Sequence, residues 1–170
     1  MQVELRLPSL DSLDHAIRDR DAFARATESD VPGDWPPEHL EAHVLDFVRS
    51  CIQRGDEHRD WGLYWIISTF PTDNRPCIAG IAGFTRPPED GSEVEIGYSV
   101  VPSLQGRGIA TRSVQMLLDK AREAGIRRVV AHTLLDHDGS IGVLEKQNFV
   151  DSGQVPGPGI RRYVLDLQND

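Results

Sequence analysis

The chain has 170 residues and a mass of 18.9 kDa, which is typical of one domain, and its hydrophobic fraction of 39% is ordinary for a globular protein. Two cysteines are too few for a disulfide framework, and the longest apolar run, eight residues, is far shorter than the ~20 residues of a membrane-spanning helix. The net charge of −9 argues against sequence-independent binding to nucleic acid, and the first residues lack the pattern of a secretory signal. We therefore expect one cytoplasmic domain over residues 1–170, with no membrane or nucleic-acid partner.

The first hundred residues carry the patterns of one strand, two helices and three further strands. Alternating apolar residues at positions 3–7 predict the first strand, and apolar residues at helical spacing predict a helix over residues 10–27. A second helix is expected to begin after Pro36 and Pro37, since proline is tolerated in the first turn. Its apolar stripe would consist of Leu40, Val44, Phe47, Val48 and Cys51. The three β-rich runs that follow are residues 61–70, 77–85 and 93–101.

The second part of the chain alternates between helix and strand. Pro102 ends the third β-rich run, and a glycine-containing turn leads into a long amphipathic helix that Gly125 caps. A strand over 128–135, a short helix over 138–147 and a last strand over 160–167 follow. The predicted order is β-α-α-β-β-β-α-β-α-β, which indicates an α/β fold with a mixed sheet.

The turn at residues 105–111 is the clearest functional signal, because it joins a strand to an amphipathic helix. Its glycines let the backbone approach a ligand closely, and the first turn of the helix presents unpaired N–H groups and the positive end of the helix dipole. Arg107 and Arg112 add positive charge at the same end. The turn is therefore a candidate site for a phosphate or pyrophosphate group.

Two phosphate-binding motifs do not fit this turn. A Walker loop requires Lys-Ser or Lys-Thr after its last glycine, and a dinucleotide fingerprint requires a glycine where Thr111 stands. Residues 100–111 instead resemble the acetyl-CoA loop of the GNAT N-acetyltransferases. The signature of that loop is Gln or Arg, two residues, Gly, one residue, and Gly or Ala, and it is matched by Gln105, Gly108 and Ala110.

Other segments resemble the same family. Residues 95–98 (EIGY) are similar to the fourth strand of the branch that includes the ribosomal-protein N-terminal acetyltransferases, and residues 140–149 are similar to its fourth helix. The resemblance implies the acyl-CoA N-acyltransferase fold. That fold has a mixed, mostly antiparallel central sheet with flanking helices, and its fourth and fifth strands splay apart around the pantetheine arm of acetyl-CoA.

The resemblance also implies where acetyl-CoA, a co-substrate, would bind. Main-chain groups of Ser99, Val100 and Val101 would pair with the pantetheine amides and the thioester carbonyl. Loop amides would hold the pyrophosphate, with the two arginines near the phosphates, and Ser140 would lie close to the sulfur. The loop residues are Gln105, Gly106, Arg107, Gly108, Ile109, Ala110, Thr111 and Arg112. The resemblance implies no metal.

The implied reaction is attack of a primary amine on the thioester carbon. An amine with a pKa near that of lysine is mostly protonated at pH 7, so a base must remove a proton. Glu95, directly or through a water, is the first candidate, and Glu93 on the same strand face is the second. The alternative is that both carboxylates belong to the solvated face of a half-exposed strand. The N–H near Val100 would polarise the thioester carbonyl.

The chain departs from the family pattern at the fourth helix. Leu144 stands where many members carry a tyrosine that protonates the leaving thiolate, and His137 stands where asparagine is common. Asn148 replaces the usual glycine before Phe149, which is a mild change because asparagine tolerates the left-handed conformation.

Three further histidines have other candidate roles. His39 and His43 are spaced i, i+4 in the second predicted helix and could ligate a metal, but no third ligand is evident. A polar margin beside the core, or contact with the acceptor, are the other interpretations of that pair. His132 lies in a predicted strand, where it is either a proton relay or, more simply, a satisfied core histidine.

The sequence thus predicts an enzyme that transfers the acetyl group of acetyl-CoA to a primary amine of a small molecule or peptide. A transferase that uses another acyl-CoA donor and a CoA-binding module without catalysis are the alternatives. The acceptor stays open among a protein α-amine, an amino acid, a polyamine and an antibiotic amine, and the acidic surface favours cationic ones. A homodimer is a further candidate assembly, because dimers are common among relatives.

Overall fold

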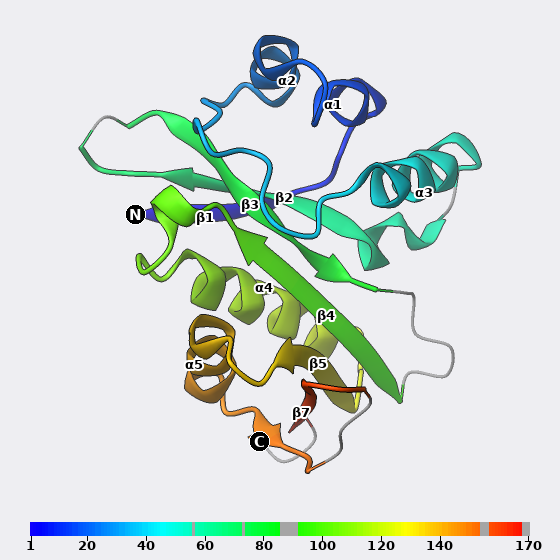
Figure 1. The fold of residues 1–170 in the computed structure, drawn as a ribbon. Helices are drawn as coiled ribbons and strands as arrows, with labels where there is room; N and C mark the ends of the chain where they lie inside the picture. The colour runs from blue at the N-terminus through cyan, green and yellow to red at the C-terminus, as the bar shows by residue number, and fades with distance from the viewer. Residues whose placement is uncertain (56, 73, 86–91, 154–156, 168–170) are drawn as a thin grey trace.

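A seven-stranded sheet forms the centre of the molecule (Figure 1). The computed structural model describes residues 1–170 apart from 56, 73, 86–91, 154–156 and 168–170. The strand order is β1-β2-β3-β4-β5-β7-β6, and neighbours are antiparallel except for the parallel pair β4 and β5. The strands are β1 (Gln2–Arg6), β2 (Leu63–Thr69), β3 (Pro76–Phe84), β4 (Glu93–Val100), β5 (Arg128–Leu134), β6 (Val150–Asp151) and β7 (Ile160–Asp166). The predicted α/β class with a mixed, mostly antiparallel sheet is confirmed.

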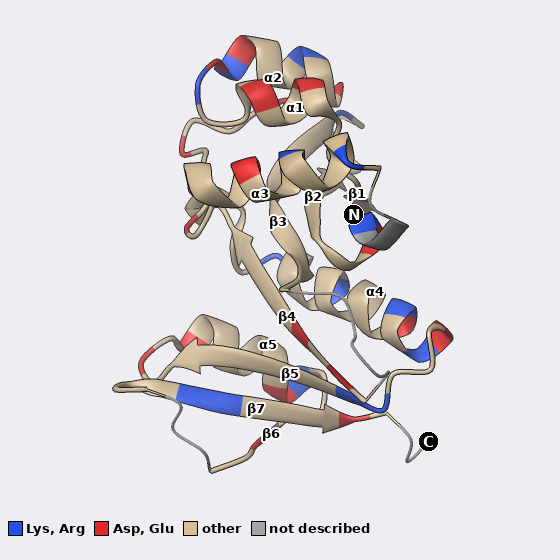
Figure 2. Cartoon of the chain, turned by 90° about the vertical axis from the view of Figure 1, so that its right-hand side faces the viewer, with Lys and Arg blue, Asp and Glu red and all other residues tan. Residues whose placement is uncertain are grey.

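Helices lie on both faces of the sheet (Figures 1 and 2). On one face, α1, α2 and α3 pack on β2 and β3 through a hydrophobic cluster that contains Phe23 and Trp65. On the other face, α4 and α5 pack through a second cluster that contains Leu117 and Leu144. The helices are α1 (Leu10–His15), α2 (Arg20–Thr27), α3 (Ala42–Gln53), α4 (Ile109–Glu123) and α5 (Asp138–Lys146), with 3₁₀ turns η1 (Glu57–Trp61) and η2 (Pro102–Leu104). Within the described ranges, none of these helices has both the length and the apolar character needed to cross a lipid bilayer.

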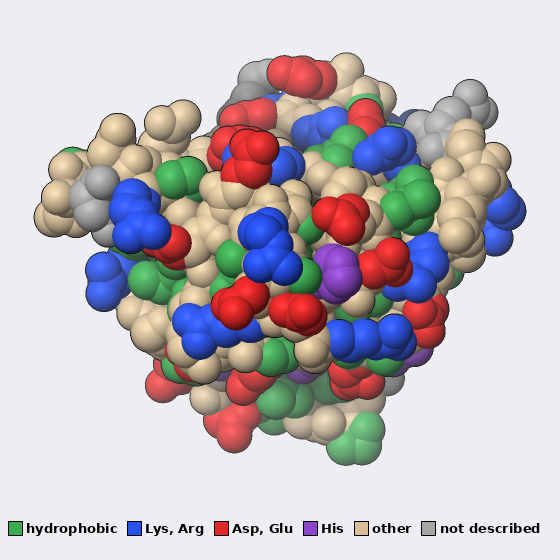
Figure 3. Space-filling view, turned by 90° about the horizontal axis from the view of Figure 1, so that it is seen from above, with side chains coloured by type: hydrophobic (Ala, Val, Ile, Leu, Met, Phe, Trp, Pro, Cys, Tyr) green, Lys and Arg blue, Asp and Glu red, His purple; other side chains and the backbone are tan. Residues whose placement is uncertain are grey.

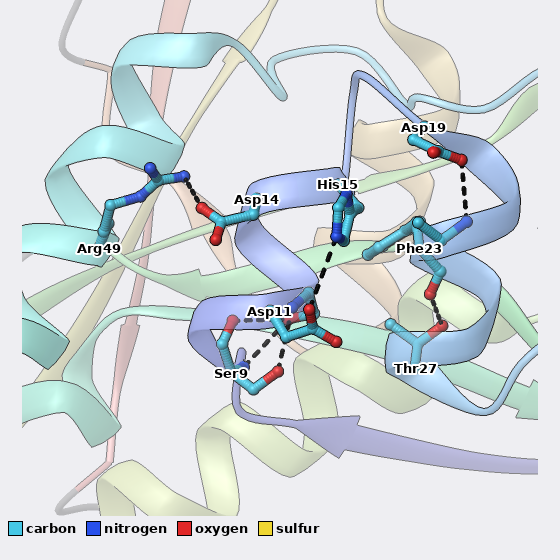
Figure 4. Close-up of polar contacts among 10 residues, drawn as sticks. Ser9, Asp11, Asp14, His15, Asp19, Phe23, Thr27 and Arg49 are labelled. Carbon is cyan, nitrogen blue, oxygen red and sulfur yellow. Dashed lines mark hydrogen bonds and ion pairs between the residues drawn. The ribbon is translucent and has the colours of Figure 1, made fainter.

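The single helix predicted over residues 10–27 is wrong, because the segment contains two capped helices. Ser9 and Ser12 form a capping box at the start of α1 (Figure 4). Asp19 begins α2 by accepting a hydrogen bond from the Ala22 N–H at 2.9 Å, so the chain turns between the two helices. The Asp19 carboxylate keeps its charge to a lower pH, since that hydrogen bond lowers its pKa.

The second predicted helix begins later than expected. α3 starts at Ala42, and His39 has a left-handed backbone (φ 67°) that no helix can contain. Leu40 is buried, but it lies in the loop before the helix, and Phe47 is 59% exposed. Leu45 is the buried residue of α3. An ion pair of 2.8 Å between Arg49 of α3 and Asp14 of α1 joins the two helices (Figure 4). Viewed from the side of these helices, acidic and basic side chains are mixed over the surface (Figure 3).

Two residues end their helices as the sequence predicts. Gly125 has φ 72° after α4, and the N–H groups of Gly125 and Ile126 donate to the carbonyls of Arg122 and Ala121. Asn148 has φ 63° after α5, and the following N–H of Phe149 donates to Leu144. The two-residue strand β6 was not predicted, since so short an element leaves no periodic pattern.

Candidate active site

The parallel strands β4 and β5 separate along their length, which leaves a gap in the sheet. They are paired from Glu93 and Arg128 to Ile96 and Ala131. Beyond that point residues 97–100 of β4 and 132–134 of β5 are not paired with each other, although β5 stays paired with β7 up to Leu134. The splayed strands that the resemblance implied are thus confirmed.

The main chain of β4 presents polar groups to this gap. The Val101 N–H donates to the Ala79 carbonyl, and the Ser99 carbonyl faces Gly80, so both residues direct their main-chain groups at β3. Alternate residues of a strand direct these groups to opposite sides. Of the three predicted main-chain positions, Val100 is therefore the one that faces the gap. The main-chain groups of Tyr98 face the gap as well, and this position was not among those predicted.

The turn after β4 is held by two side chains. The amide of Gln105 donates to the Val100 carbonyl at 2.9 Å and ties the loop to the end of the strand. Asp34 accepts from the N–H of Ser103 at 2.7 Å and from its hydroxyl at 2.8 Å. The Ser103 N–H lowers the pKa of Asp34, so this carboxylate is a charged anchor for η2.

The loop glycines bring the chain into α4. Gly106 and Gly108 have φ values of 72° and 77°, which L side chains rarely adopt, and Gly108 is the N-cap residue. Within the described part of the chain, no side chain caps this end, so the first N–H groups of α4 are open to a ligand. Arg107 lies over the Phe70 ring at 5.2 Å, and Arg112 donates to the Met1 carbonyl at 2.9 Å.

The Tyr98 and Ser140 hydroxyls meet where β4 approaches α5. The Tyr98 hydroxyl lies 3.0 Å from the Ser140 hydroxyl and donates to the Ser140 carbonyl at 3.1 Å. Burial raises the pKa of Tyr98 to about 12, so its phenol is neutral at physiological pH. The buried hydroxyl of Thr133, in the splayed part of β5, has no hydrogen-bond partner among the described residues. Leu144, at the position of the family tyrosine, is fully buried in the core.

Charged side chains line the opposite face of β4, β5 and β7, beside the start of the gap. His132 Nδ1 lies 2.7 Å from Glu95 Oε1, and the two side chains are 30% and 34% exposed. Arg162 Nη2 donates to Glu93 at 2.8 Å. Figure 2 shows this acidic part of β4 and the basic part of β7. The interpretation of His132 as a core histidine is wrong, because strand alternation puts it on the polar face with Glu95.

The histidine pair that could have ligated a metal does not form. His39 lies outside α3, so the helical spacing that would align it with His43 is absent. In the described ranges, no three His, Cys, Asp or Glu side chains are grouped as metal ligands.

Sequence reasoning missed three features of the site: the Tyr98 phenol, the Thr133 hydroxyl and the contact between Glu95 and His132. A tyrosine on the buried face of a strand requires a partner for its hydroxyl, so the alternation around Tyr98 was a usable signal. The other two depend on strand register, which no local pattern reports.

Solved structures with this fold include acetyltransferases. A putative acetyltransferase of Salmonella typhimurium, yncA, solved with acetyl-CoA, is 19% identical, has a TM-score of 0.61, and is aligned over 99% of this chain and 95% of its own. The ribosomal-protein-S5-alanine acetyltransferase of Vibrio fischeri is 17% identical, with a TM-score of 0.64 and coverage of 99% and 95%. An N-acetyltransferase of Staphylococcus aureus is 22% identical, with a TM-score of 0.63 and coverage of 99% and 100%.

The sequence itself supplies the family. No curated protein sequence matches the chain. The family profile described as an acetyltransferase (GNAT) domain matches residues 3–150, which includes both splayed strands, the loop and α4. With this match and the splayed sheet together, the chain belongs to the GNAT family of acetyl-CoA-dependent acetyltransferases.

Proposed function

We propose that the protein transfers the acetyl group of acetyl-CoA to a primary amine by direct attack of the amine on the thioester. The observation that carries this proposal is the gap between β4 and β5, where the main chain of Tyr98 and the Val100 N–H face away from β3 and are not paired with β5, and which has the open N-terminus of α4 at its end. An extended chain of amides can pair with the strand edge while an anion binds the helix end. Acetyl-CoA has both parts, an extended pantetheine arm with amides and a pyrophosphate group.

In this proposal the Val100 N–H faces the pantetheine arm and the thioester carbonyl, and Ser99 and Val101 support it through their bonds to β3. Amides of residues 106–111 receive the pyrophosphate. Gln105 holds the loop against the strand, and Arg107 and Arg112 supply positive charge around the phosphates. The unpartnered Thr133 hydroxyl supports the fit, since a buried polar group without a partner costs free energy until a ligand satisfies it.

The reaction joins the amine nitrogen to the acetyl carbon and breaks the bond between that carbon and sulfur. The Glu95 carboxylate, in contact with His132, takes part in removing the proton from the incoming ammonium. Glu93, which is bound to Arg162, is the second candidate for the base. Ser140 would lie at the sulfur end of the gap, and its hydroxyl, 3.0 Å from the Tyr98 hydroxyl, is a neutral group that can donate to the leaving thiolate.

Acetyl-CoA binding is tested by a pair of charge reversals. Thermal unfolding is measured with acetyl-CoA, and with NADH and ATP as controls; ligand at a hundred times its dissociation constant adds about 2.7 kcal/mol of stability. Arg107→Glu should weaken acetyl-CoA binding at least tenfold. Arg122→Glu, the same charge change at the other end of α4, should not. Equal binding by both variants, or no shift with acetyl-CoA in the wild type, would refute this cofactor site.

Transfer itself is tested by release of the CoA thiol with a panel of amines: free amino acids, an alanine tetrapeptide, spermidine and an aminoglycoside. Turnover with one class would name the acceptor. Binding of acetyl-CoA without turnover of any amine would favour the module without catalysis. Turnover with a longer acyl-CoA but not with acetyl-CoA would favour the other donor.

A further inference from the structure

We infer that His132 is the catalytic base and that Glu95 is a positioning residue which acts through it. The inference rests on the proposed function and assigns its proton transfer to one side chain. The contact between His132 Nδ1 and Glu95 Oε1 is 2.7 Å, the length of a charge-assisted hydrogen bond. A carboxylate oxygen accepts hydrogen bonds, so we assign the hydrogen of this contact to Nδ1, which leaves Nε2 as the ring nitrogen that can accept a proton.

The register of the strands sets the order of these two groups. Glu95 lies opposite Val130, and His132 is two residues farther along β5, past the last paired position at Ala131. Two residues of strand are about 7 Å. His132 is therefore closer than Glu95 to Val100, where the thioester carbonyl is proposed to bind. A base must lie within hydrogen-bond reach of the proton or one water away, and His132 meets that condition more easily.

The space for an amine lies beside the imidazole. Gly97 follows Glu95 on the same face of β4, and continued register would bring it level with His132. A Cβ built on Gly97 meets no described atom within 4 Å, so this position is open. His132 is 30% exposed, which leaves its ring accessible from the same side.

Charged neighbours complete the arrangement. Arg162 lies opposite His132 in the register of β5 and β7, and its side chain binds Glu93. Farther from the gap, Arg128 binds Asp166 at 2.6 Å. The acceptor ammonium gives one proton to Nε2, which passes it to water, and the freed amine attacks the thioester carbon. The second proton of the nitrogen ends on the CoA sulfur as the C–S bond breaks, so atoms and charge balance.

The test compares His132→Gln, Glu95→Gln and the double variant, with the amine that is turned over fastest in the thiol-release screen. His132→Gln should lower kcat at least about 100-fold, the lower range for loss of a general base, with KM for acetyl-CoA unchanged. Glu95→Gln should lower kcat less, and the double variant should be no slower than His132→Gln, since residues that act as one unit are not additive. Asp166→Asn is the control: it removes a charge from an ion pair on the same face and should keep kcat within twofold.

The pH profile separates a catalytic from a structural role. The rise of kcat/KM that reports the base should disappear in His132→Gln and in His132→Asn, while both variants keep the wild-type shift in melting temperature with acetyl-CoA. Retention of more than a third of wild-type kcat in His132→Gln, or additive losses in the double variant, would overturn the inference and leave Glu95 as the base. A wild type that neither binds acetyl-CoA nor releases its thiol would overturn the proposed function as well.

Discussion

The close approach of β3 to β4 predicts that Gly80→Ala damages acetyl-CoA binding as well as stability. Gly80 lies opposite Val100, and an added Cβ would lie 2.0 Å from the Ser99 carbonyl oxygen and 2.9 Å from the Val100 Cα. Ordinary contact begins at 3.4 Å, so the deficit is 1.4 Å. Backbone atoms cannot rotate away, and the strands must separate by that amount at the edge of the gap.

Two magnitudes follow from this displacement. Overpacking of this kind costs about 1–3 kcal/mol of unfolding free energy, which is a fall in melting temperature of about 2–12 °C for a chain of this size. A shift of about 1 Å in a positioning group can cost about 100-fold in rate. Urea unfolding measures the first, and calorimetric titration with acetyl-CoA together with kcat measures the second.

Gly83→Ala is the matched control, because its Cβ would lie 2.2 Å from the Gly62 carbonyl oxygen, on the side away from β4. It should lose similar stability and keep its affinity for acetyl-CoA. If both variants bind acetyl-CoA equally, the main chain at Ser99 and Val100 does not position the cofactor. If Gly80→Ala unfolds no earlier than the wild type, the close approach of β3 to β4 does not limit the size of residue 80.

Three other outcomes are expected. Gly97→Ala adds a methyl group into open space, so it should keep stability and acetyl-CoA affinity but raise KM for the amine; an unchanged KM would remove the amine from this face. Burial raises the pKa of Tyr98 to about 12, so its stabilising effect is complete below pH 10 and is lost as the pH rises through 12. Urea unfolding of the wild type should thus lose roughly 1 kcal/mol more than Tyr98→Phe between pH 9 and pH 11, and equal losses would contradict the burial of the phenol. Gln105→Ala loses the bond to Val100, and titration should show acetyl-CoA binding about fivefold weaker with the fold intact; full affinity would mean that the loop holds without it.

Elements with strong local patterns could be predicted from the sequence. β4 and α4 were expected because their periodicities are clean, and Gly125 and Asn148 because few residues adopt a left-handed backbone easily. The loop at Gln105 was found for the same reason: its glycines, its arginines and the following helix are consecutive in the chain. The prediction failed over residues 10–27, where apolar residues at helical spacing indicated one helix but Asp19 caps the start of a second.

The gap and its polar groups were decided by tertiary structure. Periodicity tells which face of a strand is buried, but not which strand lies beside it or where the pairing stops. His132 and Glu95 are 37 residues apart, and they meet only because β4 and β5 run parallel with Glu95 opposite Val130. The direction of the Val100 N–H depends likewise on its neighbour Val101 bonding to Ala79. The sequence by itself thus determined the family and the position of the glycine-containing loop at residues 105–111, because both depend on local patterns. Strand register, set by packing of the whole sheet, decided which side chains meet beside the gap.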